Sequence, residues 1–287
     1  MSLEPVVTRE IAALPVRPTD AHKGQVGRVA IIGGCSGAQT MAGAPALAAR
    51  AALRSGAGLV QAIVPGDIQQ TVIMLEPCVT TRALPLVGGS SLAAIVAEFE
   101  PDVVAVGPGL GGSILADHLR ELIEQCDKPM VIDADGLNML ARMDRFAIPN
   151  PARITLTPHP GEMKRLFDRW CPGPMPAARA DAAVTLARST GCVTVLKGAG
   201  TVVTDGRRLY VNETGNAGMA TAGAGDVLTG MIAAFVGQRL EPLEAAILGV
   251  YLHGLAGDFA AQDLGQLSLT AVDIIDALPD AFAEHGH

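Results

Sequence analysis

The stretch RVAIIGG at residues 28–34 decides how the rest of the chain is interpreted. Its continuous apolar run predicts a buried strand, and the glycines that end it predict a tight turn. The next segment, APALAARAALRSG (44–56), predicts an alanine-rich helix that stops at glycine, and LVQAIVP (59–65) predicts a second strand. A buried strand, a helix and another buried strand in this order are typical of α/β proteins with a parallel sheet.

This alternation continues along most of the chain. Further strands are expected within 102–109, 129–136, 153–162 and 193–200, and further helices within 91–99, 114–126 and 177–190. The segment 201–213 predicts a hairpin around an Asp-Gly turn, and helices are expected over about 226–237, 242–261 and 270–278. Because the strands are apolar throughout, we predict an α/β fold whose central, mainly parallel sheet carries helices on both faces. No repeat or low-complexity linker divides the chain, so we expect a single domain over residues 1–287.

Composition excludes several classes of function. The chain has 29 acidic and 21 basic residues, a net charge of -8, and only 3% aromatic residues, which argues against a nucleic-acid partner. No apolar run approaches the roughly 20 residues of a membrane span, and the N-terminal segment has no apolar signal sequence. The five cysteines form no C-x-x-C pair, which fits a cytoplasmic protein. An anionic small molecule stays open as a ligand, because backbone amides bind phosphate without side-chain charge.

Glycine, proline and polar residues gather where the expected strands end. The loops are GGCSGAQTMAGA (33–44), GPGLGG (107–112), DADGLN (133–138), TPHPGE (157–162) and KGAGT (197–201). Ligands of open α/β sheets bind beyond the carboxyl ends of the strands, so these loops are expected to form one site. The first loop does not match G-x-G-x-x-G, and no Walker motif is present, so neither a dehydrogenase-type nor a P-loop nucleotide site is favoured.

Three of these loops carry charged or titratable candidates, each with a plain structural alternative. Asp133 and Asp135 can hold Mg²⁺ through water, or one of them can cap the next helix. His159 is fixed between two prolines, although a single histidine is more often structural. Lys197 follows a strand in a glycine-rich turn, where it either contacts a phosphate or is simply solvated.

The segment TAGAGDVLTG (221–230) places one carboxylate, Asp226, in a glycine turn at the start of a helix. Successive amides of the AGAG turn and the helix dipole can bind an oxyanion there. Phosphoryl transfer needs positioned amides, a metal ion, and a base for the attacking hydroxyl. Asp226 is therefore either that base or an ordinary helix N-cap, and the two roles can coexist.

Taken in order, these motifs resemble those of a known family. The segments are HKGQVGRVAIIGG (22–34), MAGAPALAARAALRSGAGLV (41–60), VGPGLG (106–111), VIDADGLN (131–138), TPHPGE (157–162), KGAGT (197–201) and GNAGMATAGAGDVLTG (215–230). Together they resemble the ADP/ATP-dependent NAD(P)H-hydrate dehydratases. The resemblance implies a ribokinase-like fold with a core over about 20–278. It also implies a stand-alone dehydratase without the epimerase domain that many family members carry.

The resemblance implies a repair reaction on the S-form of NADH or NADPH hydrate. With Mg²⁺, ADP or ATP phosphorylates the ring hydroxyl, and loss of phosphate restores the double bond. The nucleotide would be held by Lys197, Gly198, Ala199, Gly200, Thr201 and Gly225, and the hydrate by Ala44, Gly109, His159 and Asp226. Asp226 would be the catalytic base, and the turn of Gly223, Ala224 and Gly225 would stabilise the phosphoryl group. The resemblance names no metal ligands; it implies a homo-oligomer, with a tetramer as the first candidate.

Two features depart from the family pattern, and two other functions stay open. Gln25 stands where the family commonly has an acidic residue, and the loop CSGAQTMAGA is longer than the shortest family versions. A ribokinase-like small-alcohol kinase, of the hydroxyethylthiazole or hydroxymethylpyrimidine type, shares the GAGD element and accumulates a phosphorylated product. A non-catalytic nucleotide sensor would bind nucleotide without turnover.

Overall fold

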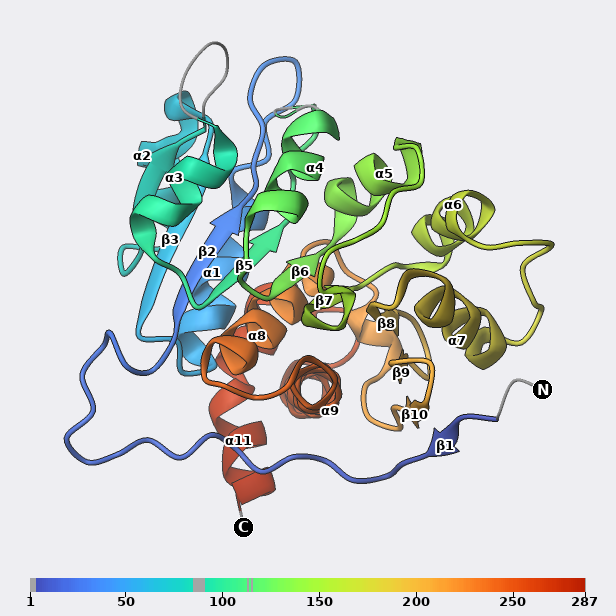
Figure 1. The fold of residues 1–287 in the computed structure, drawn as a ribbon. Helices are drawn as coiled ribbons and strands as arrows, with labels where there is room; N and C mark the ends of the chain where they lie inside the picture. Colours follow the sequence, from blue (N-terminus) through green and yellow to red (C-terminus); the bar gives the residue numbers. More distant parts are fainter. Residues whose placement is uncertain (1–3, 85–90, 113, 115, 287) are drawn as a thin grey trace.

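The computed structural model describes residues 4–84, 91–112, 114 and 116–286 of the chain. Within them the strands are β1 (Val6–Val7), β2 (Arg28–Ile32), β3 (Leu59–Val64), β4 (Thr80–Ala83), β5 (Val103–Val106), β6 (Met130–Ile132), β7 (Ile154–Leu156), β8 (Val193–Leu196), β9 (Val202–Thr204) and β10 (Arg208–Val211). They form one sheet in the order β1-β10-β9-β8-β7-β6-β5-β2-β3-β4 (Figure 1). Strands β2 to β8 pair in parallel, and β9 pairs antiparallel with β8 and β10. The expected mainly parallel sheet and the hairpin at 201–213 are confirmed.

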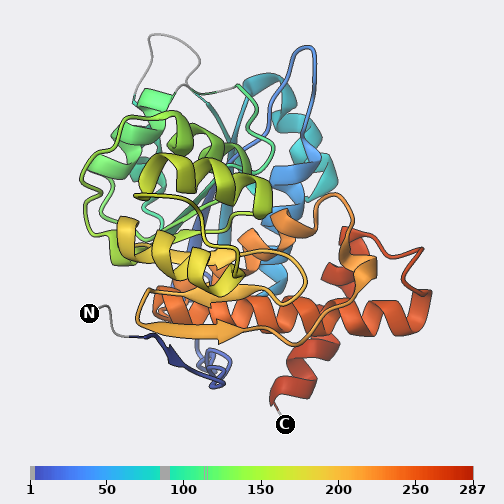
Figure 2. The same ribbon diagram turned by 90° about the vertical axis from the view of Figure 1, so that its right-hand side faces the viewer.

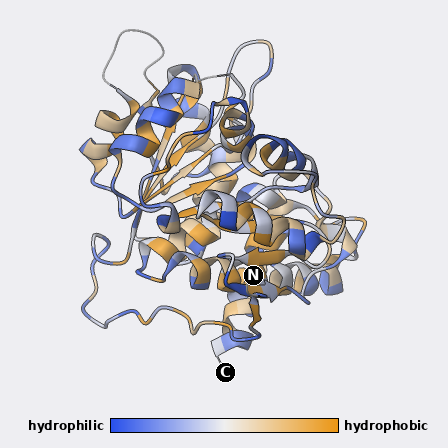
Figure 3. Cartoon of the chain, turned by 45° about the vertical axis from the view of Figure 1, so that its right-hand side comes forward, coloured by the Kyte–Doolittle hydropathy of each residue, from blue (hydrophilic) through white to orange (hydrophobic). Residues whose placement is uncertain are grey.

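Helices cover both faces of the sheet, as expected (Figures 1 and 2). The helices are α1 (Gly43–Arg54), α2 (Gln69–Leu75), α3 (Leu92–Phe99), α4 (Ala116–Gln125), α5 (Ala134–Arg142), α6 (Pro160–Trp170), α7 (Arg179–Thr190), α8 (Ala224–Gly237), α9 (Pro242–Leu264), α10 (Ala271–Asp276) and α11 (Leu278–Gly286). Helices α3 to α7 pack in one apolar cluster, and α1, α8, α9 and α10 pack in the other. Figure 3 shows apolar strands inside and hydrophilic residues on the outer helix faces.

The central strands are apolar throughout because each buries both of its faces. In β2, Val29 and Ile31 pack in the cluster that contains α1 and α8, whereas Ala30 and Ile32 pack in the cluster on the opposite side. Successive side chains of a strand point to opposite faces, so this alternation is the one that a sheet between two helical layers requires.

The chain reverses direction through the sheet at β2. From β2 it adds β3 and β4 on one side, then returns to add β5, β6, β7 and β8 on the other. The loops that follow β2 and β5 therefore diverge at a topological switch point. Open α/β sheets bind ligands at such a point, beyond the carboxyl ends of the strands.

Some boundaries and elements differ from the sequence-based expectation. Helix α8 begins at Ala224 rather than at 226, and α5 begins directly after Asp133, where a strand end was expected. Elements β1, β4, α2 and α11 were not anticipated. Leu115, within the helix expected at 114–126, lies outside the described residues. None of the described helices combines the length and the apolarity that crossing a membrane requires.

Candidate active site

The loops after β2 and β5 touch each other at the switch point. The amide of Gly34 donates to the carbonyl oxygen of Pro108 at 2.9 Å. A Cβ on Gly109, whose φ is +61°, would lie 2.8 Å from the Cβ of Ala44. Gly109 must therefore stay glycine both for its backbone angle and for this close approach. The structure thus brings together Ala44 and Gly109, two residues 65 positions apart in the sequence that were predicted separately as substrate contacts.

The glycine turn before α8 sets the position of Asp226. Gly223 is the N-cap residue and has a φ of 92°, which favours glycine; Asp226 is the third residue of the helix. The interpretation of Asp226 as the N-cap is therefore wrong, and no side-chain capping bond is formed there. The first turn of a helix leaves backbone amides without intrahelical partners. Here that turn contains Ala224 and Gly225, which belong to the predicted oxyanion turn, and Asp226.

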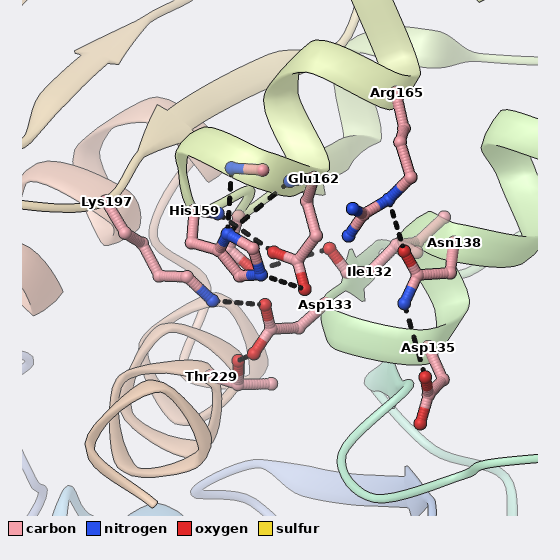
Figure 4. A network of polar contacts seen from close by, with 11 residues as sticks. Ile132, Asp133, Asp135, Asn138, His159, Glu162, Arg165, Lys197 and Thr229 are labelled. Carbon is pink, nitrogen blue, oxygen red and sulfur yellow. Dashed lines mark hydrogen bonds and ion pairs between the residues drawn. The ribbon is translucent and has the colours of Figure 1, made fainter. Parts of the chain in front are cut away.

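Lys197 and Asp133 form an ion pair beneath this turn. The ammonium of Lys197 donates to Oδ1 of Asp133 at 2.5 Å, and the hydroxyl of Thr229 donates to Oδ2 at 2.8 Å (Figure 4). The Asp133 side chain is only 1% exposed, so both of its oxygens need these partners. A Cβ on Gly225 would lie 3.2 Å from Nζ of Lys197, which places these two predicted nucleotide contacts side by side.

Asp133 is held in place by a backbone turn that few residues tolerate. Ala134 has a φ of 46°, in the left-handed region that disfavours a residue with a Cβ. A Cβ on Gly107 would lie 1.8 Å from the carbonyl oxygen of Asp133, so only glycine fits at that position. Non-glycine residues in this region concentrate at functional sites, where the surrounding structure fixes them. Asp133 occupies the N-cap position of α5 but makes no capping bond, because its oxygens face Lys197 and Thr229.

His159 caps the helix that follows it. Its Nδ1 accepts the backbone amides of Gly161 at 2.9 Å and Glu162 at 3.4 Å, and the Glu162 side chain accepts the amide of His159 at 2.8 Å. Nε2 lies 3.2 Å from Oε1 of Glu162 (Figure 4). Because Nδ1 accepts, the ring proton lies on Nε2 and points to the carboxylate. The imidazole is fixed by this reciprocal capping, rather than by the two prolines alone, and its side chain is half exposed at the edge of the sheet.

The charges at this edge are unbalanced. Burial raises the pKa of Asp226 to about 7, and the negative charges of Asp133 and Asp135 add to the rise, while Lys197 opposes it. Burial also raises the pKa of Glu162. Burial lowers the pKa of the Lys197 ammonium, but Asp133 and Glu162 raise it by more, so the net shift is upward. Lys197 therefore stays charged, and several carboxylates share this single ammonium.

The KGAGT loop is supported from α7 by an arginine that sequence reasoning missed. The guanidinium of Arg179 donates to the carbonyl oxygens of Leu196 at 3.1 Å and Lys197 at 3.2 Å. A Cβ on Gly198 would lie 3.2 Å from this guanidinium, so glycine makes room for it. The hydroxyl of Thr201 closes the loop by donating to the carbonyl of Gly198 at 2.9 Å. The predicted nucleotide residues 197–201 thus form one defined turn, with Ala199 and Gly200 exposed in it.

The structure gathers the predicted residues in two neighbouring groups. Ala44 and Gly109 lie together at the switch point, and Lys197 lies against Gly225 and exerts a charge effect on Asp226. His159 joins this second group through Glu162, whose pKa is sensitive to Lys197 and Asp133. Asp133 was considered only as a metal ligand or cap, and Thr229 was not considered. Their contacts join residues 64 and 96 positions apart, and no local pattern reports such a pairing.

A family model and the curated relatives of this chain agree on NAD(P)H-hydrate repair. A family model described as NAD(P)H-hydrate dehydratase matches residues 29–280. The bifunctional NAD(P)H-hydrate repair enzyme of Moorella thermoacetica is 44% identical over 275 residues, which are 93% of this chain and 51% of that enzyme. The chain spans about half the length of the curated relatives it matches.

Solved structures that superpose on this chain confirm the ribokinase-like fold. A ribokinase-like superfamily protein from Enterococcus faecalis V583 superposes with a TM-score of 0.81 at 27% identity, covering 95% of this chain and 92% of that one. An ADP/ATP-dependent NAD(P)H-hydrate dehydratase from Bacillus subtilis, co-crystallised with ATP and Mg²⁺, superposes with a TM-score of 0.77 at 26% identity. That match covers 95% of both chains.

Proposed function

The chain belongs to the NAD(P)H-hydrate dehydratase family, and on that premise we propose that it converts the S-form of NADH or NADPH hydrate back to the reduced dinucleotide, using ADP or ATP as phosphoryl donor. One observation carries the proposal. Asp226, with a pKa raised to about 7, stands in the first turn of α8 beside the Gly223–Gly225 amides and within the field of Lys197. A general base works best when its pKa lies near the operating pH.

The first chemical step is phosphoryl transfer to the hydrate. Asp226 accepts the proton of the ring hydroxyl, whose oxygen forms a bond to the terminal phosphorus of the nucleotide. The bond from that phosphorus to the leaving oxygen breaks, which releases AMP from ADP or ADP from ATP. The amides of Ala224 and Gly225 stabilise the charge on the transferred group, in the way that helix N-termini bind phosphate.

The second step is elimination. The ring C–O bond to phosphate breaks, and inorganic phosphate leaves with its bonding electrons. The neighbouring ring carbon gives its proton to the departing phosphate or to water, and the electrons of that C–H bond form the new C=C bond. The C=C bond of the reduced nicotinamide is thereby restored, so the proposed reaction is a lyase reaction. Phosphate is a far better leaving group than hydroxide, which is the chemical reason for spending a nucleotide on a dehydration.

The two groups of loops divide the ligands between them. Ala44 and Gly109, at the switch point, would contact the hydrate together with His159, which follows β7 further along the same edge of the sheet. The exposed turn at 197–201 and Gly225 would hold the nucleotide. Asp226 directly follows Gly225 and would act as the base where the hydrate meets the nucleotide.

The donor set at this edge fits Mg²⁺. Asp133, Glu162 and Asp226 outnumber the single ammonium of Lys197, and a divalent cation would relieve that surplus of negative charge. Within the described ranges, no cluster of three or more His, Cys, Asp or Glu side chains is arranged to bind a metal alone. Mg²⁺ would therefore be held by nucleotide phosphates, water and one or two carboxylates other than Asp226, which must stay free of the metal to act as the base. When bound, it would neutralise charge on the phosphates.

Several finer features belong to the same proposal. We expect a single domain, a cytoplasmic location, a homo-oligomer with a tetramer as the first candidate, and no nucleic-acid or membrane partner. The net charge of -8 and the five free cysteines are consistent with these expectations. The choice between ADP and ATP, and between NADH hydrate and NADPH hydrate, is decided by assay.

An absorbance assay at the reduced-nicotinamide band tests the function. The enzyme is mixed with NADH hydrate and Mg²⁺, and ADP or ATP is added in separate cuvettes. A rise in absorbance with either nucleotide is expected, and comparing the two rates identifies the donor. If neither nucleotide produces a rise while a thiazole or pyrimidine alcohol is converted to a stable phosphate ester, the protein is a small-alcohol kinase instead.

A further inference from the structure

Among the residues that the structure describes, no carboxylate pairs with the guanidinium of Arg165, which lies beside the proposed substrate site. We propose that its guanidinium binds a phosphate group of the dinucleotide hydrate, a contact that holds the substrate but takes no part in the chemistry. This inference rests on the proposed function and adds the residue that recognises the charged part of the substrate. Three features support it: the hydrogen bonds that orient Arg165, the donors on its terminal nitrogens, and the negative charge of the surrounding carboxylates.

A chain of hydrogen bonds fixes Arg165 to the loop after β5. Nε of Arg165 donates to Oδ1 of Asn138 at 2.9 Å, and the Asn138 amide donates to Oδ1 of Asp135 at 3.3 Å. The other oxygen of Asp135 accepts the amide of Gly111 at 2.7 Å. Figure 4 shows Arg165, Asn138 and Asp135 in this sequence. The guanidinium is thus oriented relative to the loop that contains Gly109, although Arg165 itself lies on the exposed face of α6.

The rest of the guanidinium is free to bind a ligand. In the part of the chain that the structure describes, the Nε bond to Asn138 is the only hydrogen bond of the Arg165 side chain, and no carboxylate pairs with it. Its two terminal nitrogens therefore keep their donors open. A planar fork of this kind matches the oxygens of a phosphate, which it can bind through two parallel hydrogen bonds.

The fork lies close to His159, on the substrate side of the site. A Cβ built on Gly161 would be 2.8 Å from Cε1 of His159 and 3.7 Å from a terminal nitrogen of Arg165. In Figure 4, Lys197 and Arg165 stand on opposite sides of the His159–Glu162 pair. Arg165 is thus connected to the loops proposed to hold the hydrate, rather than to the nucleotide turn at 197–201.

Charge balance explains why such a cation is needed. Asp133, Asp135, Glu162 and Asp226 surround this edge, and Lys197 is already paired with Asp133. A hydrate that brings a pyrophosphate, and in the NADPH form a 2′-phosphate, would otherwise meet a mainly negative field. Arg165 supplies a positive charge on the exposed face of α6, and it is not among the charges that shift the pKa of Asp226.

Kinetics of matched variants test the proposal. Arg165→Gln removes the charge, Arg165→Lys keeps it without the fork, and Lys164→Gln is the control. Lys164 is an exposed cation on the same helix, paired with Asp168 at 2.6 Å. We expect Arg165→Gln to raise the KM of the hydrate about tenfold or more, the size of a lost charge-assisted hydrogen bond. Its kcat and the KM of the nucleotide should stay within about twofold of wild type, Arg165→Lys should be intermediate, and Lys164→Gln should be unchanged.

Comparing NADH hydrate with NADPH hydrate identifies which phosphate group of the substrate Arg165 binds. An equal rise of KM for NADH hydrate and NADPH hydrate assigns Arg165 to the pyrophosphate, and a rise confined to NADPH hydrate assigns it to the 2′-phosphate. An unchanged KM for both hydrates, or a rise only for the nucleotide, overturns the proposal. Thermal melting of each variant confirms that it is folded.

A binding experiment separates this inference from the proposed function. Fluorescence titration with NADPH, which carries both phosphate groups, reads the contact without any turnover. Weaker NADPH binding by Arg165→Gln than by wild type and Lys164→Gln supports the inference even if wild type shows no dehydration, which would count against the function alone. Equal binding by all three proteins overturns the inference while leaving an active wild type unaffected.

Discussion

At the scale of single residues, Asp226 is subject to two opposing effects. A carboxylate in the first turn of a helix is stabilised by the helix dipole, which lowers its pKa. Burial and the charges of Asp133 and Asp135 act the other way, and the pKa of Asp226 rises to about 7. A carboxylate with this pKa still ionises at neutral pH and accepts a proton far more strongly than an ordinary aspartate does.

The first prediction concerns Asp226→Asn. We expect kcat to fall by about 10²–10⁴-fold, the usual contribution of a general base. Since the base must be ionised in the free enzyme, wild-type kcat/KM should rise with pH through about 7 and then level off. A pH–rate profile measures this, and a variant that keeps a near-normal rate, or a flat wild-type profile between pH 6 and 8, would remove Asp226 from the role of base.

The same shift predicts a change in stability with pH. Because the folded-state pKa of Asp226 is raised, folding favours its neutral form, and this contribution is fully present below the ordinary pKa of 3.8. It is lost as pH rises from there through about 7. Asp226→Asn stays neutral, so its melting temperature relative to wild type should be higher at pH 8 than at pH 5. A constant difference across this range would mean that the pKa is not raised.

The second prediction concerns the buried pair of Lys197 and Asp133. Lys197→Ala should weaken nucleotide binding, but it also leaves the Asp133 carboxylate buried without a cation. Removing one partner of such a pair lowers the free energy of unfolding by about 3–5 kcal/mol. Because the Lys197 side chain is 17% exposed, we expect a value at the lower end of this range. The double variant Asp133→Asn, Lys197→Ala should recover most of that loss in urea unfolding. If the losses of the two single changes simply add, the two side chains are not coupled in the folded state.

At the scale of elements, the close packing of α1 and α8 fixes where the glycine turn stands. A Cβ on Gly230 would lie 2.0 Å from the carbonyl oxygen of Ala48, so the two helices meet at backbone distance. Thr229 is the neighbour of Gly230 and donates to Asp133 at 2.8 Å. The small residue that lets α8 approach α1 therefore also sets the position of a residue in the site.

The third prediction compares two glycine-to-alanine changes in helices. Gly230→Ala should lower the free energy of unfolding by about 1–3 kcal/mol, because the added methyl group meets backbone atoms that cannot easily move aside. Gly43→Ala adds a methyl at the start of α1, where nothing lies within 4 Å, and should be neutral or stabilising by up to about 1 kcal/mol. Urea unfolding of both variants measures the difference. Equal effects would show that the contact with Ala48 is relieved by a shift of α8.

Elements with a strong apolar pattern could be predicted from the sequence, and elements that depend on distant partners could not. Helix α1 and strands β2, β3, β5 and β8 appear close to their expected positions. Strand β4 has the sequence TTRA and is largely exposed, so it carries no apolar pattern. Strand β1 has two exposed valines and exists through its pairing with β10, about 200 residues away in the sequence.

The predicted helix boundaries were wrong where the backbone takes an uncommon conformation. Helix α5 starts immediately after β6 through the left-handed residue Ala134, and alanine gives no sign of such a turn. For α8, the carboxylate of Asp226 was weighed as the N-cap, whereas the N-cap is Gly223, which provides no side-chain bond. Glycine signals a turn but does not show which of several glycines ends it.

At the scale of the whole molecule, the topology assembles the site from residues spread over most of the chain. Loops after β2, β5, β6, β7 and β8 lie along one edge of the sheet, and those after β6 and β8 meet the first turn of α8. The convergence could be predicted, because parallel strands present their carboxyl ends together. The pairing of particular side chains, such as Asp133 with Thr229, could not, since it depends on how the layers pack.

The fourth prediction concerns this assembled site as one binding unit. ADP with Mg²⁺ at about 100 times its Kd should raise the free energy of unfolding by about 2.7 kcal/mol. For a chain of this size that corresponds to a melting temperature higher by roughly 4–5 °C. Asp226→Asn should show the same shift as wild type, since it loses the base but keeps the turn at 197–201 and the first turn of α8.

Differential scanning fluorimetry of wild type, Asp226→Asn and Lys197→Ala, with and without the nucleotide, distinguishes the outcomes. A shift in the first two proteins and a smaller one in Lys197→Ala would separate nucleotide binding from catalysis at these residues. A shift lost in Asp226→Asn would mean that this carboxylate supports nucleotide binding, through Mg²⁺ or through the turn itself. A nucleotide sensor would show the wild-type shift too, so turnover measured on the same samples decides between sensor and enzyme.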